Sequence, residues 1–595
     1  MKGPPAPPPH SGTLNEVLVA AARHPSGITF ADLREREVAL SWAEVLARAE
    51  RAAAGLVELG VRRGERVAIV LPTSPEFVDA FFGTLLAGGV PVPLYPPVRL
   101  GRLAEYGATT ARLLSSVGAA VVLTDALIRA LLGEAVALAR PRRGCRTVAG
   151  LPAPAGKWTA PAARPEDLAL IQFSSGATVD PKPVALTHRA LVSQCAMLTA
   201  MLPRAGHDPD RGVSWLPLYH DMGLIAGPLL AAYVPGSLVL LRPEQFLARP
   251  ALWLRAIGRH RATLTPAPPF ALGLCTRRIA DSELEGVDLS SLRLLTCGAE
   301  PISLDTVRGF GRRFARFGLD PDVICPVYGL SEAALAVTFS PPGRPARALC
   351  VDATRLAAAG EAVPGGRPIV SVGTPIPGVE VEVRGADGAA AGERRVGRIW
   401  VKSPSLLSAY FGRPESTAAA VEDGWLDTGD LGFVADGELY VTGRAKDIVI
   451  IRGANHDPQE FEEPLLAVAG VRPGCAVALG LTPDGEDSEA LLVLAERDPS
   501  HPGEAAGELE ARVAEAVLAA TGIAPYAVVL LPPGALPRTS SGKLRRAEAL
   551  RRHLAGELAA PPAASAWRLA GALLRSARGF LRAGSAPASS DRRGT

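Results

Sequence analysis

The sequence predicts an α/β fold: a large N-terminal domain of several subdomains with parallel-rich sheets, followed by a smaller α+β C-terminal domain. Two observations carry this prediction. The chain has 595 residues, which exceeds the size at which a single hydrophobic core stops growing. Short apolar runs alternate with helical patterns along it, and this alternation is typical of parallel sheets with helices on both faces.

Composition excludes several classes of protein. Hydrophobic residues make up 48% and charged residues 21% of the chain, as in a globular protein. A net charge of +3 argues against a broad nucleic-acid-binding face. Seven cysteines without a C-x-x-C pair suit a reducing cytosol and no zinc site. Because there is neither an apolar signal core after Lys2 nor a run approaching the ~20 apolar residues of a spanning helix, we expect a cytoplasmic protein.

The first part of the chain is predicted to alternate between helices and strands. Residues 1–12 are Pro-rich and expected to be disordered. From 13 to 59 the apolar spacing is mostly helical, with Ser41 and Glu44 as a capping box. We further expect a helix at 75–86, with the proline in its first turn, and strands at 67–71, 90–97, 119–124 and 168–173.

The strand at 168–173 leads into a loop rich in hydroxyl groups, with a helix expected near His188. Such a loop can bind phosphate through hydroxyl donors, a close-approaching glycine backbone and a lysine charge. It is not a Walker A loop, and an ordinary surface turn between strand and helix is the alternative. The candidate phosphate-binding residues are Ser174, Ser175, Gly176, Thr178 and Lys182.

The order of these residues resembles the phosphate loop of the adenylate-forming superfamily, usually [ST]-S-G-[ST]-T-G-x-P-K-G. Ala177, Val179 and Pro183 replace a hydroxyl residue and two glycines. The replacement at Val179 is a habit of one branch, the fatty acyl-AMP ligases. The string from Trp215 to Ile225, W-L-P-L-Y-H-D-M-G-L-I, also resembles that branch.

His220 lies in this second string. A lone histidine beside an aspartate is more often structural than catalytic. The resemblance implies instead that His220 lines the acyl tunnel beside the reacting carboxylate.

Two later strands, expected at 292–296 and 323–327, end in small and polar residues. Ligands of open α/β sheets bind at such carboxyl ends, although strand-end turns are the plain alternative. The resemblance implies that Gly298, Ala299 and Glu300 flank the adenine of ATP and that Tyr328, next to Gly329, stacks on it. It also implies that Ser331 and Glu332 face phosphate and Mg²⁺, for which a carboxylate oxygen is a suitable ligand.

Residues 341–368 form an added segment rich in Pro, Gly and Ala. A long surface loop is the alternative, although such loops are uncommon in compact domains. The runs 351–356 and 362–364 resemble the insertion of fatty acyl-AMP ligases, which restrains their C-terminal domain.

Candidate residues for ribose binding and for a hinge follow the insertion. Asp430 stands in the turn-like string Gly424 to Asp430, where an aspartate is ordinarily a cap. The resemblance implies that Asp430 accepts hydrogen bonds from both ribose hydroxyls, that Arg444 reaches ribose or phosphate, and that Lys446 is the hinge of a mobile C-terminal domain. Residues 451–460 again match acyl-AMP ligases better than CoA ligases.

The C-terminal domain carries strand patterns at 475–481 and 490–495 and a helix at 508–520. Lys543 lies in a Ser/Gly loop, where a lysine is usually just solvated. The resemblance makes it the catalytic lysine, which stabilises negative charge in the adenylation transition state. We therefore expect domains at 13–441 and 442–556 and a tail at 557–595.

A helical projection of the tail separates its side chains into two sides. A basic amphipathic helix over 566–582 could lie on an anionic membrane or dock on a partner, and a functionless extension is the alternative. Arg568, Arg575, Arg578 and Arg582 share one side, and Leu569, Leu573, Leu574, Phe580 and Leu581 cover the other.

The resemblance spans residues 13–554 and implies a fatty acyl-AMP ligase. Such an enzyme uses ATP and Mg²⁺ to convert a fatty acid to acyl-AMP and pyrophosphate, then passes the acyl group to an acyl carrier protein in lipid or polyketide biosynthesis. Two alternatives stay open: an acyl- or aryl-CoA synthetase, and an inactive relative used for binding or scaffolding. Neither the acyl chain length nor the oligomeric state follows from the sequence.

Overall fold

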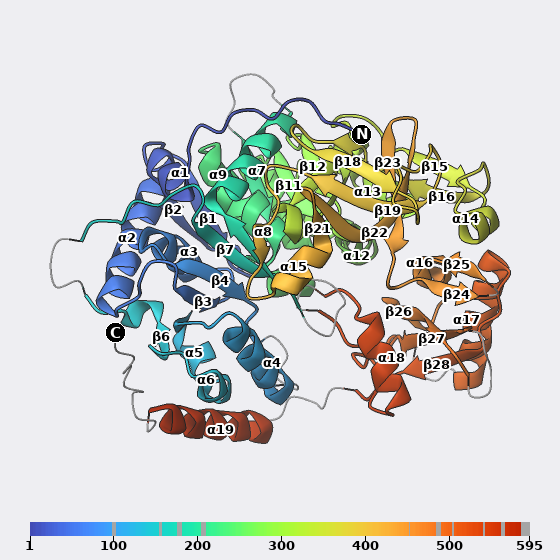
Figure 1. Cartoon of the computed structure of the whole chain (residues 1–595). Helices are drawn as coiled ribbons and strands as arrows, with labels where there is room; N and C mark the ends of the chain where they lie inside the picture. The colour runs from blue at the N-terminus through green and yellow to red at the C-terminus, as the bar shows by residue number, and fades with distance from the viewer. Residues whose placement is uncertain are drawn as a thin grey trace.

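The computed structural model describes residues 1–97, 103–153, 158–174, 181–203, 210–451, 453–483, 489–501, 505–539, 542–560 and 566–584 (Figure 1). A nine-stranded sheet forms its centre. The pairs between β13 and β1 are parallel, whereas β2, β14 and β17 add antiparallel edges. The strand order is β17 (Thr374–Pro375), β14 (Ala336–Phe339), β13 (Ile324–Gly329), β12 (Leu294–Cys297), β11 (Leu264–Ala267), β9 (Arg211–Ser214), β10 (Ser237–Leu240), β1 (Gly27–Ala31) and β2 (Glu37–Ser41).

Both faces of this sheet are buried. Leu294 faces one apolar cluster, and Leu295 faces another, because successive strand residues point to opposite faces. Trp253 and Phe310 join the second cluster. The helices on the two sides are α7 (His188–Met201) and α9 (Leu230–Tyr233) on the first, and α11 (Ala251–His260), α12 (Pro269–Arg278) and α13 (Leu304–Phe314) on the second.

A second, fully parallel sheet follows the same rule. It consists of β4 (Val90–Leu94), β3 (Arg66–Val70), β5 (Val121–Thr124) and β6 (Cys145–Thr147). Helices α2 (Trp42–Glu58) and α3 (Pro75–Leu86) pack together beside it. Ser41 and Glu44 make the predicted capping box of α2. Parallel sheets covered by helices confirm the predicted α/β class.

The region 13–59 is less helical than its apolar spacing suggests. Only α1 (Leu14–Ala21) and α2 are helices, and β1 and β2 form a hairpin between them. β1 pairs with β10 along the edge of the central sheet. Pairing with a partner far along the chain therefore overrides the local pattern, as often happens for strands.

Residues 1–12, which composition predicts to be disordered, make several contacts with the rest of the chain. The amino group of Met1 donates to the carbonyl of Val381 at 2.6 Å. Gly3 donates to the carbonyl of Val379 at 2.8 Å. The His10 ring stacks on Tyr233 with centroids 3.9 Å apart. The segment follows β18 (Glu380–Arg384) because an edge strand presents unpaired backbone groups.

The loop predicted to bind phosphate joins two strands rather than a strand and a helix. β7 (Leu168–Phe173) pairs antiparallel with β8 (Pro183–Thr187), and α7 begins directly after β8. β8 also pairs with the short strand β20 (Ala409–Tyr410). The apolar run from Val184 to Leu186 is too short to predict a strand before the helix.

The added segment forms structure of its own. β15 (Ala348–Val351) and β16 (Arg367–Val370) pair antiparallel, and α14 (Ala353–Ala359) lies between them. Leu356 and Ile369 pack against Phe433 and Tyr440, which belong to the sheet that carries β18. The other strands of that sheet are β19 (Gly397–Lys402), β21 (Val421–Glu422), β22 (Trp425–Ala435) and β23 (Glu438–Arg444).

The chain after β23 builds a separate group of elements (Figure 1). A three-stranded sheet places Val493 in one apolar cluster and Leu492 in another, so both of its faces are covered. That sheet consists of β26 (Val471–Leu481), β27 (Ala490–Arg497) and β28 (Ala527–Leu531), and β24 (Val449–Ile451) pairs with β25 (Ala454–His456). The helices of the group are α16 (Pro458–Glu462), α17 (Ala506–Thr521) and α18 (Arg546–Leu554).

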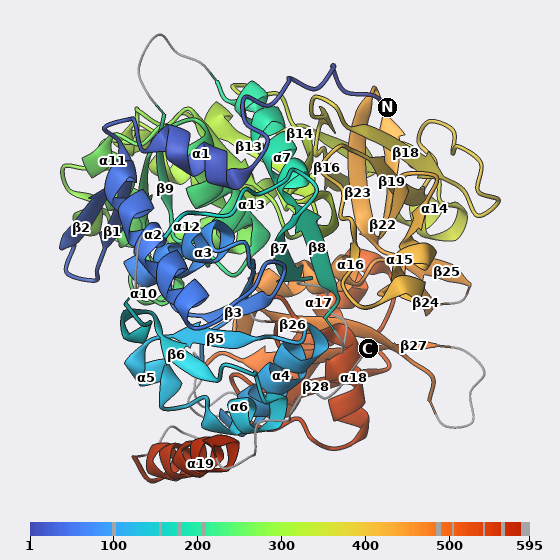
Figure 2. The same ribbon diagram turned by 60° about the vertical axis from the view of Figure 1, so that its left-hand side comes forward.

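The last helix, α19 (Ala566–Gly584), returns to the first part of the molecule. It lies along α6 (Gly133–Ala139), below the parallel sheet, in both views (Figures 1 and 2). Within the described ranges, no helix is both long and apolar enough to cross a bilayer.

Candidate active site

A cleft of about 1960 Å³ lies between the carboxyl ends of the central strands and the C-terminal group. Tyr328 lines it from β13 and Lys543 from the loop before α18. Pockets for one small molecule are roughly 300–1,000 Å³. The cleft is therefore large enough for a nucleotide together with a second substrate.

Two hydrogen bonds between Ser174 and Lys182 join the two ends of the hairpin loop at the cleft. The amide of Ser174 donates to the carbonyl of Lys182 at 2.9 Å, and the amide of Lys182 donates to Ser174 Oγ at 3.2 Å. The Lys182 ammonium lies 4.5 Å from the centroid of the Tyr410 ring, a cation–π distance. Ser175, Gly176 and Thr178 lie outside the described residues.

A tight turn follows β12 at Gly298 and Ala299. A Cβ atom at Gly298 would lie 2.5 Å from the carbonyl oxygen of Val327, so only glycine fits there. Ala299 has a φ of 68°, in the left-handed region that is uncommon for alanine. Burial raises the pKa of Glu300, and the Lys543 ammonium opposes that shift. The turn places Glu300 at the cleft wall.

Tyr328, Asp430 and Arg444 form a connected group beside this turn. The Tyr328 hydroxyl donates to Asp430 Oδ2 at 2.7 Å, and Arg444 Nε lies 3.0 Å from Asp430 Oδ1. Asp430 stands opposite Arg444 in the pairing of β22 with β23, so its position is set by a strand and not by the predicted turn. Gly329, the last residue of β13, also lines the cleft.

Ser331 and Glu332 follow Gly329 in a short 3₁₀ turn. The Ser331 hydroxyl donates to Asp221 Oδ2. The Tyr410 hydroxyl donates to Glu332 Oε1 at 3.0 Å. Burial raises the pKa of Glu332, because the charged carboxylate is poorly solvated there, and a cation bound beside it would oppose that shift.

His220 and Asp221 make a buried pair at the start of α8 (Asp221–Leu224). His220 Nδ1 lies 2.6 Å from Asp221 Oδ1. Burial acts to raise the pKa of Asp221, but His220 and the Ser331 hydroxyl hold it below its usual range. Among the described residues, His220 Nε2 has no hydrogen-bond partner although it is buried. With Nδ1 held by a carboxylate, Nε2 is available to a ligand in the cleft.

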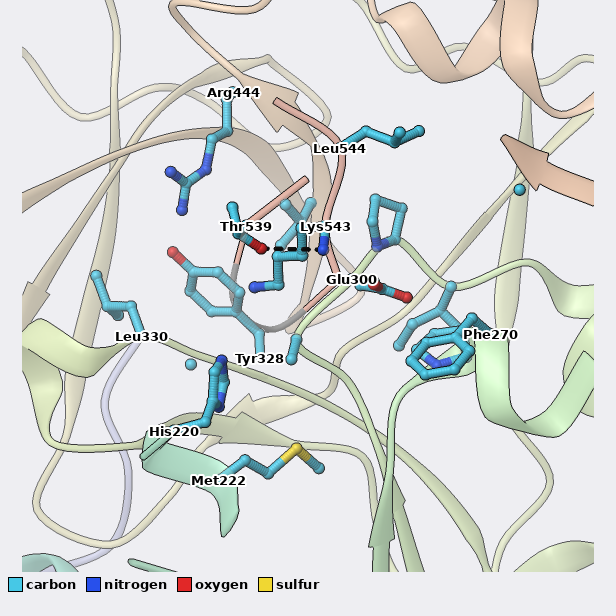
Figure 3. Close-up of a pocket in the computed structure, with 18 of the residues that line it drawn as sticks. His220, Met222, Phe270, Glu300, Tyr328, Leu330, Arg444, Thr539, Lys543 and Leu544 are labelled. Atoms are coloured by element: carbon cyan, nitrogen blue, oxygen red, sulfur yellow. Dashed lines mark hydrogen bonds between the residues drawn. The ribbon is translucent and has the colours of Figure 1, made fainter. Parts of the chain in front are cut away.

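Lys543 reaches the cleft from the C-terminal group. Thr539 and Lys543 close a small loop: the Thr539 amide donates to the Lys543 carbonyl at 2.7 Å, and the Lys543 amide donates to Thr539 Oγ1 at 3.0 Å. The side chain extends beside the Tyr328 ring, with His220 and Glu300 nearby (Figure 3). Burial lowers the pKa of Lys543, while Glu300 and Asp221 oppose this shift.

Two parts of the molecule meet at an ion-pair cluster on the rim of the cleft. Arg367, at the start of β16, pairs with Glu460 and lies 3.7 Å from Asp457 Oδ2. His456 Nδ1 lies 3.1 Å from the other oxygen of Glu460. Burial raises the pKa of Asp457 to about 7, although Arg367 acts to lower it. The added segment is thus ionically linked to α16 of the C-terminal group.

The described candidates other than Gly298 line one cleft, and Gly298 directly precedes the lining residue Ala299. Lys446 is exposed in the loop between β23 and β24. Sequence reasoning missed Tyr410, which contacts Glu332 and Lys182, and Arg367. No local pattern marks either one, because their partners lie 78 or more residues away. For Asp221 the sequence shows only that it follows His220, and its contact with Ser331 is known from the structure.

The sequence profile of AMP-binding enzymes matches residues 18–411. The chain belongs to the AMP-binding enzyme family. A family member from Moorena producens, the medium-chain-fatty-acid–acyl-carrier-protein ligase JamA, is 33% identical over 577 residues, covering 92% of this chain and 96% of that protein. A Caulobacter vibrioides protein with a provisional acyl-CoA synthetase name is 37% identical over 559 residues, covering 91% and 96%.

One solved structure in the family comes from a study of fatty acyl-adenylate ligases of E. coli and L. pneumophila. It matches with a TM-score of 0.85 at 36% identity and covers 92% of this chain and 99% of that chain. These likenesses confirm three predictions: the adenylate-forming fold, the acid–AMP ligase activity with ATP, and the fatty acyl-AMP ligase type.

Proposed function

We propose that this enzyme activates a fatty acid and transfers it to an acyl carrier protein for lipid or polyketide biosynthesis. In the first step, a carboxylate oxygen attacks the α-phosphorus of ATP, the bond to the β-phosphate breaks, and pyrophosphate leaves. In the second, the phosphopantetheine thiol of the carrier attacks the acyl carbonyl, AMP leaves, and the thiol loses its proton. The name of the Moorena producens relative supports this acceptor.

The apolar limb of the cleft supports an acyl substrate. Leu198 of α7, Leu202 directly after it, Leu230 of α9 and Phe339 of β14 are apolar residues of the cleft lining, and we assign the acyl limb to them. An alkyl chain in such a limb is stabilised by ~0.8 kcal/mol for each buried CH₂ group. His220 also lines the cleft, and its Nε2 atom is the group we assign to the substrate carboxylate.

The polar residues of the cleft have the chemistry that the nucleotide requires. Asp430 offers a charged acceptor to the ribose hydroxyls, with Arg444 fixing its orientation. We assign the adenine to the space between Tyr328 and the turn of Gly298, Ala299 and Glu300. The phosphates lie toward Ser331 and Lys182, with the hairpin loop residues Ser174, Ser175, Gly176 and Thr178 as further donors.

Lys543 is the residue we assign to the chemical step. Its ammonium can approach the oxygen atoms between the carboxylate and the α-phosphate, where negative charge develops. The lowered pKa of this lysine reflects burial in the cleft, where a fixed cation stabilises a developing anion more strongly than in water.

Glu332 is the proposed Mg²⁺ ligand. Mg²⁺ commonly takes one or two protein carboxylates and completes its coordination with substrate phosphates and water, and a single glutamate on the cleft wall fits that pattern. When bound, the ion supplies positive charge that offsets the triphosphate.

The structural observation that favours a carrier over free CoA is the contact of Arg367 with Glu460 and Asp457. We propose domains at 13–441 and 442–556, a tail at 557–595, and a hinge at Lys446. Reorienting the second domain to accept a thiol would separate these charges. A carrier protein can offset that cost through contacts of its own, whereas free CoA offers few.

The test supplies fatty acid, ATP and Mg²⁺ with either CoA or a phosphopantetheinylated carrier, and measures pyrophosphate and both thioesters. We expect pyrophosphate release and acyl-carrier formation with little acyl-CoA. Efficient acyl-CoA formation would overturn the proposal in favour of a CoA synthetase. If no fatty acid of any length releases pyrophosphate, the chain is an inactive relative.

A further inference from the structure

Helix α19 is docked on α6 through a narrow strip of small residues. The Gly133 amide donates to Ser576 Oγ at 2.7 Å. A Cβ atom at Gly579 would lie 2.4 Å from the backbone of Gly133, so the two helices approach as closely as glycine allows. The Arg129 guanidinium lies 5.3 Å from the centroid of the Phe580 ring. These contacts fix the rotation of α19 about its own axis.

With that rotation fixed, the outward face of α19 is known. Leu574 is 63% exposed, Leu581 is 74% exposed, and Leu573 beside them is 38% exposed. Leu574 and Leu581 are seven residues apart and therefore share one side of the helix. The helical projection predicts that these leucines share one side with Leu569 and Phe580. In the structure the exposure of the five side chains differs, because Leu569 and Phe580 are only partly exposed.

Arginines border the leucine side. Arg575, Arg578 and Arg582 are exposed, and the chain from 566 to 584 contains no Asp or Glu. Arg575 lies 3.8 Å from Glu134 of α6. The side chain of Arg568 lies outside the described ones. The outward surface of α19 thus combines exposed leucines with a net positive charge along the helix.

The same part of the molecule carries further exposed leucines. Leu127 of α5 (Ala126–Arg129) is 76% exposed, and Leu138 of α6 is 67% exposed. Sixteen large apolar side chains are clearly exposed within the described ranges, and five of them lie on α5, α6 and α19. Such a concentration marks an interaction surface. Figures 1 and 2 place these three helices together on the outer side of the parallel sheet, away from the C-terminal sheet.

We propose that the surface formed by α5, α6 and α19 docks on an anionic lipid membrane. The leucines stand on a convex helix rather than in a groove, and a bilayer is the partner whose apolar region they can enter without a matching shape. The arginines then lie at the level of lipid phosphates, where each contributes about fivefold to binding. This role goes beyond the proposed catalysis and does not depend on it.

The experiment is co-sedimentation of the full-length protein with vesicles of phosphatidylcholine, with or without phosphatidylglycerol. We expect pelleting with the anionic vesicles, less with neutral ones, and a decrease as salt screens the arginines. The double variant Leu574→Glu/Leu581→Glu should lose about tenfold or more of this binding. Leu518→Glu, at a leucine of α17 that is 46% exposed, is the matched control and should bind like wild type.

Unfolding temperatures and pyrophosphate release should be the same for all three proteins, because the substituted side chains face solvent. Pelleting of the double variant equal to wild type would overturn the proposal, as would wild-type protein that stays in solution with anionic vesicles. Light scattering gives a further arm. If wild type were a dimer without lipid and the double variant a monomer, the surface would be a contact between copies of this chain.

Discussion

Replacing Arg367 with alanine should release the C-terminal domain from the added segment. The Arg367 side chain is 19% exposed, and its guanidinium faces Glu460 and Asp457. Truncating one partner of a buried charge pair costs roughly 2–5 kcal/mol. We take the lower end, about 2 kcal/mol, because His456 still contacts Glu460. This energy changes the ratio of the two domain orientations by about thirtyfold.

The assay measures acyl-AMP and acyl-CoA from the same reaction with free CoA. We expect acyl-CoA to rise at least tenfold while acyl-AMP formation changes little, because the adenylating orientation remains populated. Arg395→Ala is the control, since its pair with Glu361 has an arginine side chain that is 55% exposed and surface pairs contribute little. An unchanged product ratio in Arg367→Ala would refute the restraint. This substitution is cleaner than deletion of 341–368, which would expose Phe433 and Tyr440.

Three further predictions follow from single residues. Lys543→Ala should lower acyl-AMP formation about 10²–10³-fold with little change in unfolding temperature; near-normal activity would remove the lysine from the mechanism. Gly298→Ala should raise the KM for ATP, because the new Cβ would meet the Val327 carbonyl; unchanged kinetics would place the adenine elsewhere. Asp457 has a folded-state pKa of about 7, above its ordinary 3.8, so between these values the folded state binds its proton more tightly than the unfolded state. The contribution of Asp457 to the free energy of unfolding should therefore fall as pH rises from about 4 to 7, by at most ~1.4 kcal/mol per pH unit. Asp457→Asn should keep the cap of α16 and flatten this part of the profile of unfolding temperature against pH, and an unaltered profile would contradict the assignment.

Strand ends were the most predictable feature of the site. Gly298 and Ser331 follow short apolar runs, and the structure places both at carboxyl ends of adjacent strands of the central sheet. Short apolar runs are sufficient to predict the strand ends there, whereas the binding roles of the two residues came from the family resemblance. The capping box of Ser41 with Glu44 was predictable for the same reason.

Pairing between distant segments was not predictable. β8 is defined by hydrogen bonds to β7 and β20, and β1 by those to β10. Asp430 reads as a turn aspartate until β23 is placed beside it. The contact of Arg367 with Glu460 spans 93 residues. For β1, β20 and Arg367 the decisive partner is far along the chain, whereas β7 with β8 and β22 with β23 are neighbouring strands whose pairing the local sequence pattern does not indicate.

The docked tail helix attaches the C-terminal domain to the rest of the molecule at a second point. One attachment is the loop at Lys446; the other runs from Leu554, at the end of α18, to Ala566, at the start of α19. This linker spans at most about 40 Å when it is fully extended. A domain rotation that moves the end of α18 farther than this from the start of α19 would require α19 to dissociate from α6. If the C-terminal domain reorients as proposed, the chain length between 555 and 565 would limit the movement, and lengthening that stretch would widen its range without altering any residue of the cleft.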